Sequence, residues 1–110
     1  MTVPDFDLRL VRSDARMHIA PIGELDIATA PQFEEAIIAA TSEPVSELVL
    51  DLRGLTFMDS TGLRTLAQAN LKAEQAGTAL SIWRGSRQIE RVLEISGLGP
   101  LLPLADPPAD

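Results

Sequence analysis

Acidic and hydroxyl side chains concentrate in two short segments of the chain, residues 23–26 and residues 57–62. Each segment follows an apolar run typical of a strand and precedes a pattern typical of a helix. In open α/β sheets, binding sites form at the carboxyl ends of strands, where loops lead into helices. If the two strands are parallel neighbours, both segments emerge at the same edge of the sheet. The side chains that would then share one surface are Glu24, Asp26, Asp59 and Ser60.

The hydroxyl of Ser60 has two interpretations at the start of the predicted helix. Its spacing alone favours an N-cap, in which the side-chain oxygen accepts hydrogen bonds from first-turn amides. The alternative is an exposed hydroxyl at a helix N-terminus, where free amides and the helix dipole favour a phosphate. Phosphorylation would add about −1.5 to −2 charges beside Asp59 and Asp26. Both interpretations hold together if Asp59 or Thr61 caps the helix. Gly62 either relieves crowding against a partner or eases the turn into the helix, and the sequence leaves both roles open.

Other chemistries are less well supported by the residues. An aspartyl-phosphate site on Asp51 would need paired acids after the first strand and a lysine late in the chain. Lys72 is the only lysine, and it falls in a predicted helix. We therefore expect Asp51 to end its strand by hydrogen-bonding the following loop. Serine hydrolase chemistry is disfavoured because Ser60 is not in a Gly-x-Ser-x-Gly turn, and His18 is expected to be a half-exposed strand residue.

The composition excludes further classes of site and partner. The chain has no cysteine and one histidine, which rules out thiolate zinc sites, iron–sulfur clusters and multi-histidine metal sites. No glycine-rich phosphate-binding loop is present in the sequence. A net charge of −7 and an aromatic content of 4% argue against direct nucleic-acid binding. Trp83 is expected in the core or at its rim. We predict no metal and no cofactor for this chain.

The sequence also bears on the membrane. No apolar run approaches the roughly 18 residues that are needed to cross a bilayer. The first residues lack a basic region followed by an apolar stretch, so no secretory signal is expected. We therefore predict no membrane insertion and a cytoplasmic location.

Strands and helices must alternate along the chain to position these residues. Apolar alternation predicts strands over residues 6–11 and 17–22, which form a hairpin. Pro21 should lie at an edge or a strand end, because it cannot donate a ladder hydrogen bond. Thr29 and Gln32 predict a capping box at the start of the first helix. The remaining predicted elements are a strand over 48–52, a loop over 53–58, a helix from 59 to Gly77, a strand over 78–83, a helix from Ser86 to Gly97 and a short edge strand over 101–104.

This order, β-β-α-β-α-β-α-(β), predicts an α/β fold. We expect a single mixed, mostly parallel sheet with an antiparallel N-terminal hairpin. A length of 110 residues and an apolar content of 45% suit one domain with a buried core. The expected organisation is therefore a single domain over 1–110, with its core in about 6–104 and a flexible, proline-rich tail over 105–110.

Four segments form a pattern that extends over nearly the whole chain, from about Phe6 to Leu104. They are Gly23-Glu24-Leu25-Asp26, Leu48-Val49-Leu50-Asp51-Leu52, Phe57-Met58-Asp59-Ser60-Thr61-Gly62-Leu63 and Glu94-Ile95-Ser96-Gly97-Leu98. Together these segments resemble the STAS domain family, and within it the bacterial anti-sigma factor antagonists. The resemblance implies the STAS fold for this α/β chain.

The resemblance also implies a function. Ser60, directly after the aspartate of its motif, would be the phosphoacceptor. The unphosphorylated form would bind an anti-sigma factor that is also a serine kinase, which frees a sigma factor for transcription. Phosphorylation of Ser60 would switch this binding off, and a metal-dependent serine phosphatase would restore it. On this interpretation the chain is a phosphoprotein and a partner-switching regulator, not an enzyme. The implied partner-binding residues are Glu24, Asp26, Asp59, Ser60, Thr61 and Gly62.

An alternative function shares the same fold. The chain would then be a non-switching STAS scaffold or interaction subunit, such as a small stressosome protein or a subunit of a lipid-transport complex. The two functions differ in whether a kinase transfers phosphate to the chain.

Overall fold

Strands and helices alternate along the chain in nearly the predicted order. The computed structural model describes residues 6–109. Its elements are β1 (Phe6–Ser13), β2 (Arg16–Leu25), α1 (Ala30–Thr41), β3 (Glu47–Asp51), the 3-10 turn η1 (Leu52–Gly54), β4 (Leu55–Met58), α2 (Ser60–Ala76), β5 (Ala79–Trp83), α3 (Arg87–Ser96), the 3-10 turn η2 (Gly99–Leu101) and β6 (Leu104–Ala105).

The strands of the described region form one mixed sheet in the order β1-β2-β3-β5-β6, and β4 pairs with β2 beside this path. The β1–β2 pair is antiparallel, and every other pair is parallel. This topology confirms the predicted fold class. The parallel pairs matter for the site, because they bring the carboxyl ends of β2 and β4 to the same edge.

The long strand β2 changes partner along its length. Residues 16–19 pair with β3, whereas residues 23–25 pair with β4. Pro21 is buried between these two ladders, so its expected place at an edge or strand end is wrong. The proline is tolerated because neither β3 nor β4 pairs with β2 at that position. Gly23 has a φ of 102° where the register with β4 shifts, a backbone conformation that favours glycine.

Two segments that were expected to be loops are strands. Residues 23–25 continue β2, so only Asp26 begins the loop that was predicted to start at Gly23. Residues 55–58 form β4 rather than part of a loop over 53–58. Leu55 and Met58 are buried while the two residues between them are exposed, so four residues show no strand alternation that the sequence could reveal.

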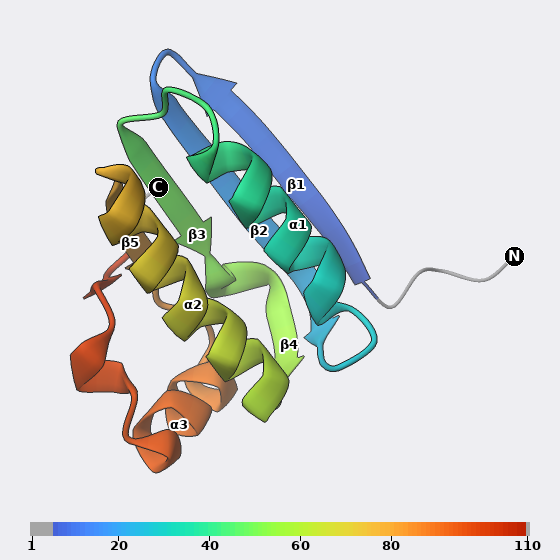
Figure 1. Cartoon of the computed structure of the whole chain (residues 1–110). Helices are drawn as coiled ribbons and strands as arrows, with labels where there is room; N and C mark the ends of the chain where they lie inside the picture. The colour runs from blue at the N-terminus through green and yellow to red at the C-terminus, as the bar shows by residue number, and fades with distance from the viewer. Residues whose placement is uncertain (1–5, 110) are drawn as a thin grey trace, which may run out of the picture.

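The hydrophobic core lies between the sheet and the helices. Figure 1 shows α1 and α2 side by side across one face of the sheet, with α3 below α2 in this view, and α3 also packs against β4. The core is built from the inward side chains of the strands and one face of each helix. Its largest fully buried members include Ile19, Leu25, Phe33, Ile37, Leu48, Leu50, Leu66, Ile82 and Ile89.

The C-terminal ends of α2 and α3 and the start of α3 follow the predicted signals, whereas the predicted cap at the start of α1 is not formed. Gly77 and Gly97 end α2 and α3 with φ values of 72° and 75°, as expected of glycine C-caps. Ser86 caps α3 by accepting a hydrogen bond from the Ile89 amide.

The predicted tail begins with Ala105, which the structure places in β6 beside Trp83.

Within residues 6–109, no helix combines the length and the apolar character that are needed to cross a membrane.

Candidate functional site

The two segments that carry the candidate residues lie side by side at the carboxyl edge of the sheet. Leu25 of β2 pairs with Met58 of β4 in a parallel ladder. The amide of Asp59 then donates to the Leu25 carbonyl oxygen at 3.2 Å. The structure therefore brings the Asp26 loop and the start of α2 together, as the sequence predicts. The strand that delivers Ser60 to this edge is β4 rather than the expected β3.

Asp59 takes the capping role at the start of α2. Its carboxylate accepts hydrogen bonds from the amides of Thr61, at 2.9 Å, and Gly62, at 3.3 Å. Ser60 is the first residue of the helix and is exposed. Among residues 6–109, nothing forms a hydrogen bond with its hydroxyl. The open question about Ser60 is therefore answered: the helix is capped without it, and its hydroxyl faces solvent.

Gly62 allows α2 to begin close against the sheet. A Cβ atom at this position would lie 2.6 Å from Met58 Cγ and 3.0 Å from Leu25 Cδ2. Both distances are shorter than normal van der Waals contact, so a larger residue would push the helix away from β2 and β4. The crowding that Gly62 relieves is within the chain, and its expected part in partner binding stays a prediction.

Asp26 holds the loop between β2 and α1 through its side chain. The carboxylate Oδ1 accepts from the amides of Ala28, at 2.9 Å, and Thr29, at 3.2 Å. Thr29 is the N-cap residue of α1, but its side chain makes no capping bond. Its hydroxyl instead donates to the Glu24 carbonyl oxygen at 2.8 Å and accepts from the Asp26 amide. The predicted capping box with Gln32 is therefore wrong, because the Thr29 hydroxyl is committed to the loop.

These bonds give Asp26 a structural role in addition to the predicted role in binding. We expect Asp26→Ala to lower the free energy of unfolding by about 1 kcal/mol, as for the loss of a helix cap. Asp26→Asn keeps the accepting oxygen and removes the charge, so its thermal melting should stay closer to that of the parent. Thermal melting of both variants measures the structural role separately from the predicted role in binding. If the asparagine variant melts as low as the alanine variant, hydrogen bonding at Asp26 does not hold the loop.

The carboxylates of this edge do not form a metal-binding group. Glu24 is exposed at the end of β2, and Asp26 and Asp59 are engaged with backbone amides. Across residues 6–109, no three potential ligands from His, Cys, Asp and Glu lie close enough to hold a metal ion.

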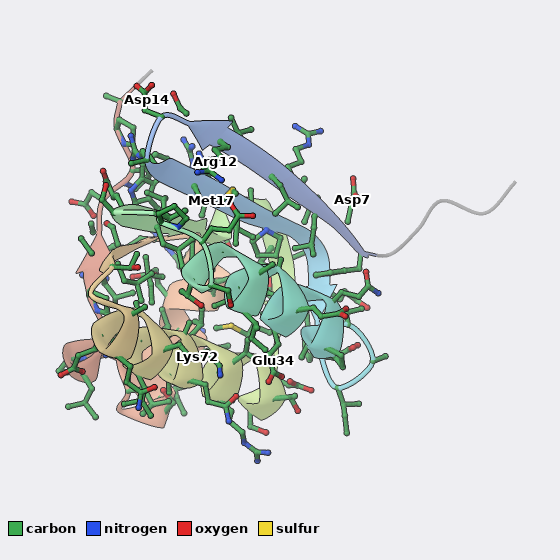
Figure 2. The ribbon with its side chains drawn as sticks, turned by 45° about the horizontal axis from the view of Figure 1, so that its top comes forward. Asp7, Arg12, Asp14, Met17, Glu34 and Lys72 are labelled. Carbon is green, nitrogen blue, oxygen red and sulfur yellow. The ribbon has the colours of Figure 1, made fainter. Side chains whose placement is uncertain are left out.

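Lys72 lies in the C-terminal half of α2 (Figure 2), about 18 Å along the helix from Ser60 at 1.5 Å per residue.

A second polar cluster, which the sequence analysis did not assemble, lies around Asp51 at the end of β3. The side chain of Asp51 is 8% exposed, and it accepts from the Arg53 amide and from the Arg53 guanidinium at 2.9 to 3.3 Å. The hydrogen bond from the Arg53 amide confirms that Asp51 ends its strand by hydrogen-bonding the following segment. His18 Nε2 lies 3.0 Å from Asp51 Oδ2, and its ring meets Trp83 edge-on at 4.9 Å.

The Asp51 cluster stabilises the side of the sheet that α1 and α2 leave uncovered. The guanidinium groups of Arg16 and Arg53 lie 5.5 and 5.2 Å from the centre of the Trp83 ring. His18 is half-exposed, as predicted, but it is also bound to Asp51. The pairing of neighbouring strands could have revealed this cluster. His18, Asp51 and Trp83 lie on the same face of β2, β3 and β5, which are neighbours in the sheet.

Acid should weaken the Asp51 cluster. Burial alone raises the pKa of the Asp51 carboxyl, but hydrogen bonds from Arg53 and His18 outweigh it and hold the pKa below its ordinary value of 3.8. A lowered folded-state pKa contributes stability above the unfolded-state pKa, and that contribution is lost as pH falls through the folded-state value. We therefore expect Asp51→Asn to destabilise the chain at pH 6 and to make less difference at the acid end of the titration. Urea unfolding of both proteins across this range provides the measurement, and a pH-independent difference would contradict the prediction.

Comparisons with known proteins place this arrangement in a family. The STAS domain model matches residues 8–109. An anti-sigma-B factor antagonist from Staphylococcus epidermidis is 32% identical over 80 residues, which cover 73% of this chain and 74% of that protein. A corresponding protein from Staphylococcus aureus matches to the same extent.

Solved structures agree with the sequence relatives. An anti-sigma factor antagonist from Mycobacterium paratuberculosis superposes with a TM-score of 0.85 at 29% identity, covering 100% of this chain and 93% of that one. The antagonist SpoIIAA in its unphosphorylated form gives a TM-score of 0.76 at 26% identity, with coverages of 94% and 88%.

Anti-sigma factor antagonists are regulatory proteins rather than enzymes, which agrees with the expectation that this chain is not an enzyme. The family match covers nearly the whole described region and includes both segments at the carboxyl edge. The chain therefore belongs to the STAS domain family and, within it, is similar to the anti-sigma factor antagonists.

Proposed function

We propose that the unphosphorylated chain binds an anti-sigma factor serine kinase, which then releases its sigma factor, and that phosphorylation of Ser60 ends this binding. A metal-dependent serine phosphatase returns the chain to its binding state. The cycle takes place in the cytoplasm, where the sigma factor acts. The chain is the substrate and the switch of this cycle.

The observation that carries the proposal is the state of the Ser60 hydroxyl. It is exposed and free of hydrogen bonds to the described residues at the first position of α2, because Asp59 supplies the cap. A kinase can therefore reach the oxygen without unwinding the helix. SpoIIAA, whose fold this chain shares at a TM-score of 0.70 and 26% identity, has also been solved in a phosphorylated form.

The residues around Ser60 supply the rest of the proposed surface. Glu24 and Asp26 lie on the neighbouring segment, and Asp59 and Thr61 flank the acceptor. Gly62 sets how closely the helix start approaches the sheet. A partner that covers Ser60 at this edge must also contact the Asp26 loop.

The proposal is tested by release of a sigma factor. A purified complex of an anti-sigma factor kinase and its sigma factor, from the organism that encodes this chain, is titrated with the unphosphorylated chain. We expect free sigma factor in size-exclusion chromatography without ATP, and less of it after incubation with ATP and Mg²⁺. Binding without any phosphate transfer, under conditions in which the kinase is active, would favour the non-switching scaffold. No binding by any such kinase would refute the proposal.

A further inference from the structure

The strand β1 forms an open border of the sheet. It pairs with β2 along one side, and within residues 6–109 no strand pairs with its other side. Figure 1 shows β1 at the margin of the sheet with only β2 beside it. Natural proteins protect such a border with prolines, bulges, short strands or charges, because an open border pairs readily with another strand. The eight residues of β1 contain no proline, and their register with β2 runs without interruption from Phe6 to Ser13.

The backbone groups of Leu8 point outward from this border. The Leu8 amide donates to the carboxylate of its neighbour Asp7 at 2.9 Å, at an exposed position. Leu8 stands opposite Pro21, which has no amide hydrogen to donate, so the two form a non-hydrogen-bonded pair of the β1–β2 ladder. Because such pairs alternate along an antiparallel ladder, the amides and carbonyl oxygens of Phe6 and Leu10 also point outward. β1 therefore presents the backbone groups of residues 6, 8 and 10 to a further strand.

The side chains of β1 differ in character between the two faces of the sheet. Phe6, Leu8 and Leu10 lie on the face that the helices cover, where Phe6 and Leu8 pack against the core. Leu10 is 56% exposed on that face. Asp7 and Arg9 lie on the uncovered face, and both are exposed. A strand that paired with this border would therefore meet an apolar row on one face and a carboxylate followed by a guanidinium on the other.

The charges of Asp7 and Arg9 have no ionic partner within the described region. The two residues of β2 that pair with them are apolar, so neither charge meets an opposite charge across the ladder. Arg9 makes no hydrogen bond or ion pair with any residue from 6 to 109. Asp51, which lines the same hollow of the uncovered face as Arg9, is already bound to Arg53 and His18. An opposite charge that reached Asp7 or Arg9 from another chain would therefore meet an unpaired group.

These features become self-complementary under a two-fold axis at Leu8. Two antiparallel copies of β1 then place Leu8 opposite Leu8 of the second copy, and Asp7 opposite Arg9 on both sides of the axis. Phe6 comes opposite Leu10 on the face that the helices cover. The outward backbone groups of residues 6, 8 and 10 meet those of residues 10, 8 and 6, as an antiparallel ladder requires. Both exposed charges and the exposed leucine gain a cross-strand partner in this way.

Other two-fold registers lose this complementarity. An axis at Asp7 or at Arg9 places like charges opposite each other, which is destabilising. An axis at Leu10 brings neither charge opposite its counterpart. Arg12 lies outside the pairing about Leu8 and is ion-paired with Glu43 of its own chain. The charges of β1 therefore disfavour the shifted registers and favour the one centred on Leu8.

We propose that β1 is the site at which two copies of this chain associate, by antiparallel pairing of residues 6–10 about a two-fold axis at Leu8. The two sheets become one continuous sheet, through a contact that is identical on both copies and closes on itself. The strand that leads to Ser60, β4, pairs with β2 on the side away from β1. The contact therefore does not depend on kinase binding, and a dimer of this kind carries two Ser60 residues outside the paired strands.

Charge reversal tests the contact and its register together. Asp7→Arg and Arg9→Asp each place like charges opposite each other at two positions of the dimer, whereas the double variant restores opposite charges. Sedimentation velocity of the full chain over a range of concentrations at low salt measures the dimer Kd, because salt screens exposed charges. We expect each single variant to raise the Kd at least tenfold and the double variant to stay within threefold of the parent. Arg91→Asp should stay within twofold, and it is the matched control because Arg91 is exposed on α3 and its reversal changes the net charge as Arg9→Asp does.

A cysteine at the axis tests the register directly, because the chain has no cysteine of its own. The Cα atoms of a hydrogen-bonded antiparallel pair lie about 5.5 Å apart, which is within the span of a disulfide. Leu8→Cys should therefore form a disulfide-linked dimer under mild oxidation. Leu10→Cys should not, because four residues of strand, about 14 Å, separate it from its counterpart on the second copy.

Three results would overturn the proposal. The first is a parent chain that stays monomeric up to millimolar concentration. The second is a dimer whose Kd neither single reversal changes, because the copies would then meet through another surface. The third is a Leu8→Cys chain that does not cross-link at concentrations at which the parent is dimeric. Circular dichroism of the charge variants should match that of the parent, because exposed side chains contribute little to folding. If a reversal does unfold the chain, the cysteine pair decides the outcome.

Discussion

Substituting Ser60 by alanine is expected to abolish phosphate transfer to the chain while leaving its fold and its binding to the kinase intact. The hydroxyl at this position takes part in no hydrogen bond to the described residues, and Asp59 caps α2 through its own carboxylate. Its removal should therefore change the free energy of unfolding by no more than about 0.5 kcal/mol. Incubation with the kinase and ATP, followed by mass spectrometry of the intact protein and of its peptides, gives the measurement.

Thr61 provides the control for this substitution, because its hydroxyl is the nearest competitor. Thr61 is half-buried in the first turn of α2, and its amide donates to Asp59. Thr61→Ala should therefore still accept phosphate on Ser60. Two results would show that Ser60 is not the acceptor. One is full phosphorylation of Ser60→Ala, and the other is loss of phosphorylation in Thr61→Ala while kinase binding is normal.

Phosphorylation of Ser60 is expected to weaken the complex with the kinase several-hundredfold without refolding the chain. Free amides at a helix N-terminus stabilise a phosphate by donating hydrogen bonds to it, but the amides of Thr61 and Gly62 already donate to the Asp59 carboxylate. A partner that closes over this edge must then bury a dianion beside Asp59, and an unpaired buried charge is costly. A loss of about 3–4 kcal/mol of binding free energy corresponds to several hundredfold in Kd, at roughly tenfold per 1.4 kcal/mol.

The measurement combines calorimetry with amide chemical shifts. The phosphorylated chain and Ser60→Asp are both titrated with the kinase, and the parent serves as the reference. Shifts should move mainly in residues 24–28 and 57–65, because these segments are neighbours at the carboxyl edge of the sheet, whereas the core side chains are buried. Shifts spread through the whole sheet would indicate refolding. A phosphorylated chain that binds as tightly as the parent would show that charge at Ser60 does not control release.

The fold class and the site edge could be predicted from the sequence because their signals are local. Gly77, Ser86 and Gly97 mark helix ends by their residue type, and the apolar run that begins at Leu48 marks β3, whose residues 48–51 are buried. The juxtaposition of Asp26 and Ser60 followed from the rule that parallel strands carry their loops to one edge. The exposed state of Ser60 did not follow, because serine and aspartate both suit the N-cap and only the structure shows which one fills it.

The features that the sequence missed depend on pairing between distant segments. Pro21 was expected at an edge or a strand end, but it lies inside β2, where neither β3 nor β4 pairs with it because β2 changes partner there. The Asp51 cluster required the register of three strands, since it joins His18, Asp51 and Trp83. The Thr29 hydroxyl donates a hydrogen bond to the Glu24 carbonyl oxygen instead of capping α1, because the loop closes on itself. The capping-box spacing of Thr29 and Gln32 does not reveal that Glu24 competes for this hydroxyl.

The meeting of β2 and β4 has a consequence for how the chain is recognised. Ser60 and the Asp26 loop are separated by more than thirty positions in the sequence, and the parallel pairing of β2 with β4 brings them together. A synthetic peptide spanning residues 57–62 would carry the hydroxyl but neither its helical turn nor the facing loop. On the proposed function, the kinase would therefore recognise a conformational epitope rather than a linear one, and a chain that has not completed its sheet would neither bind the kinase nor be modified by it.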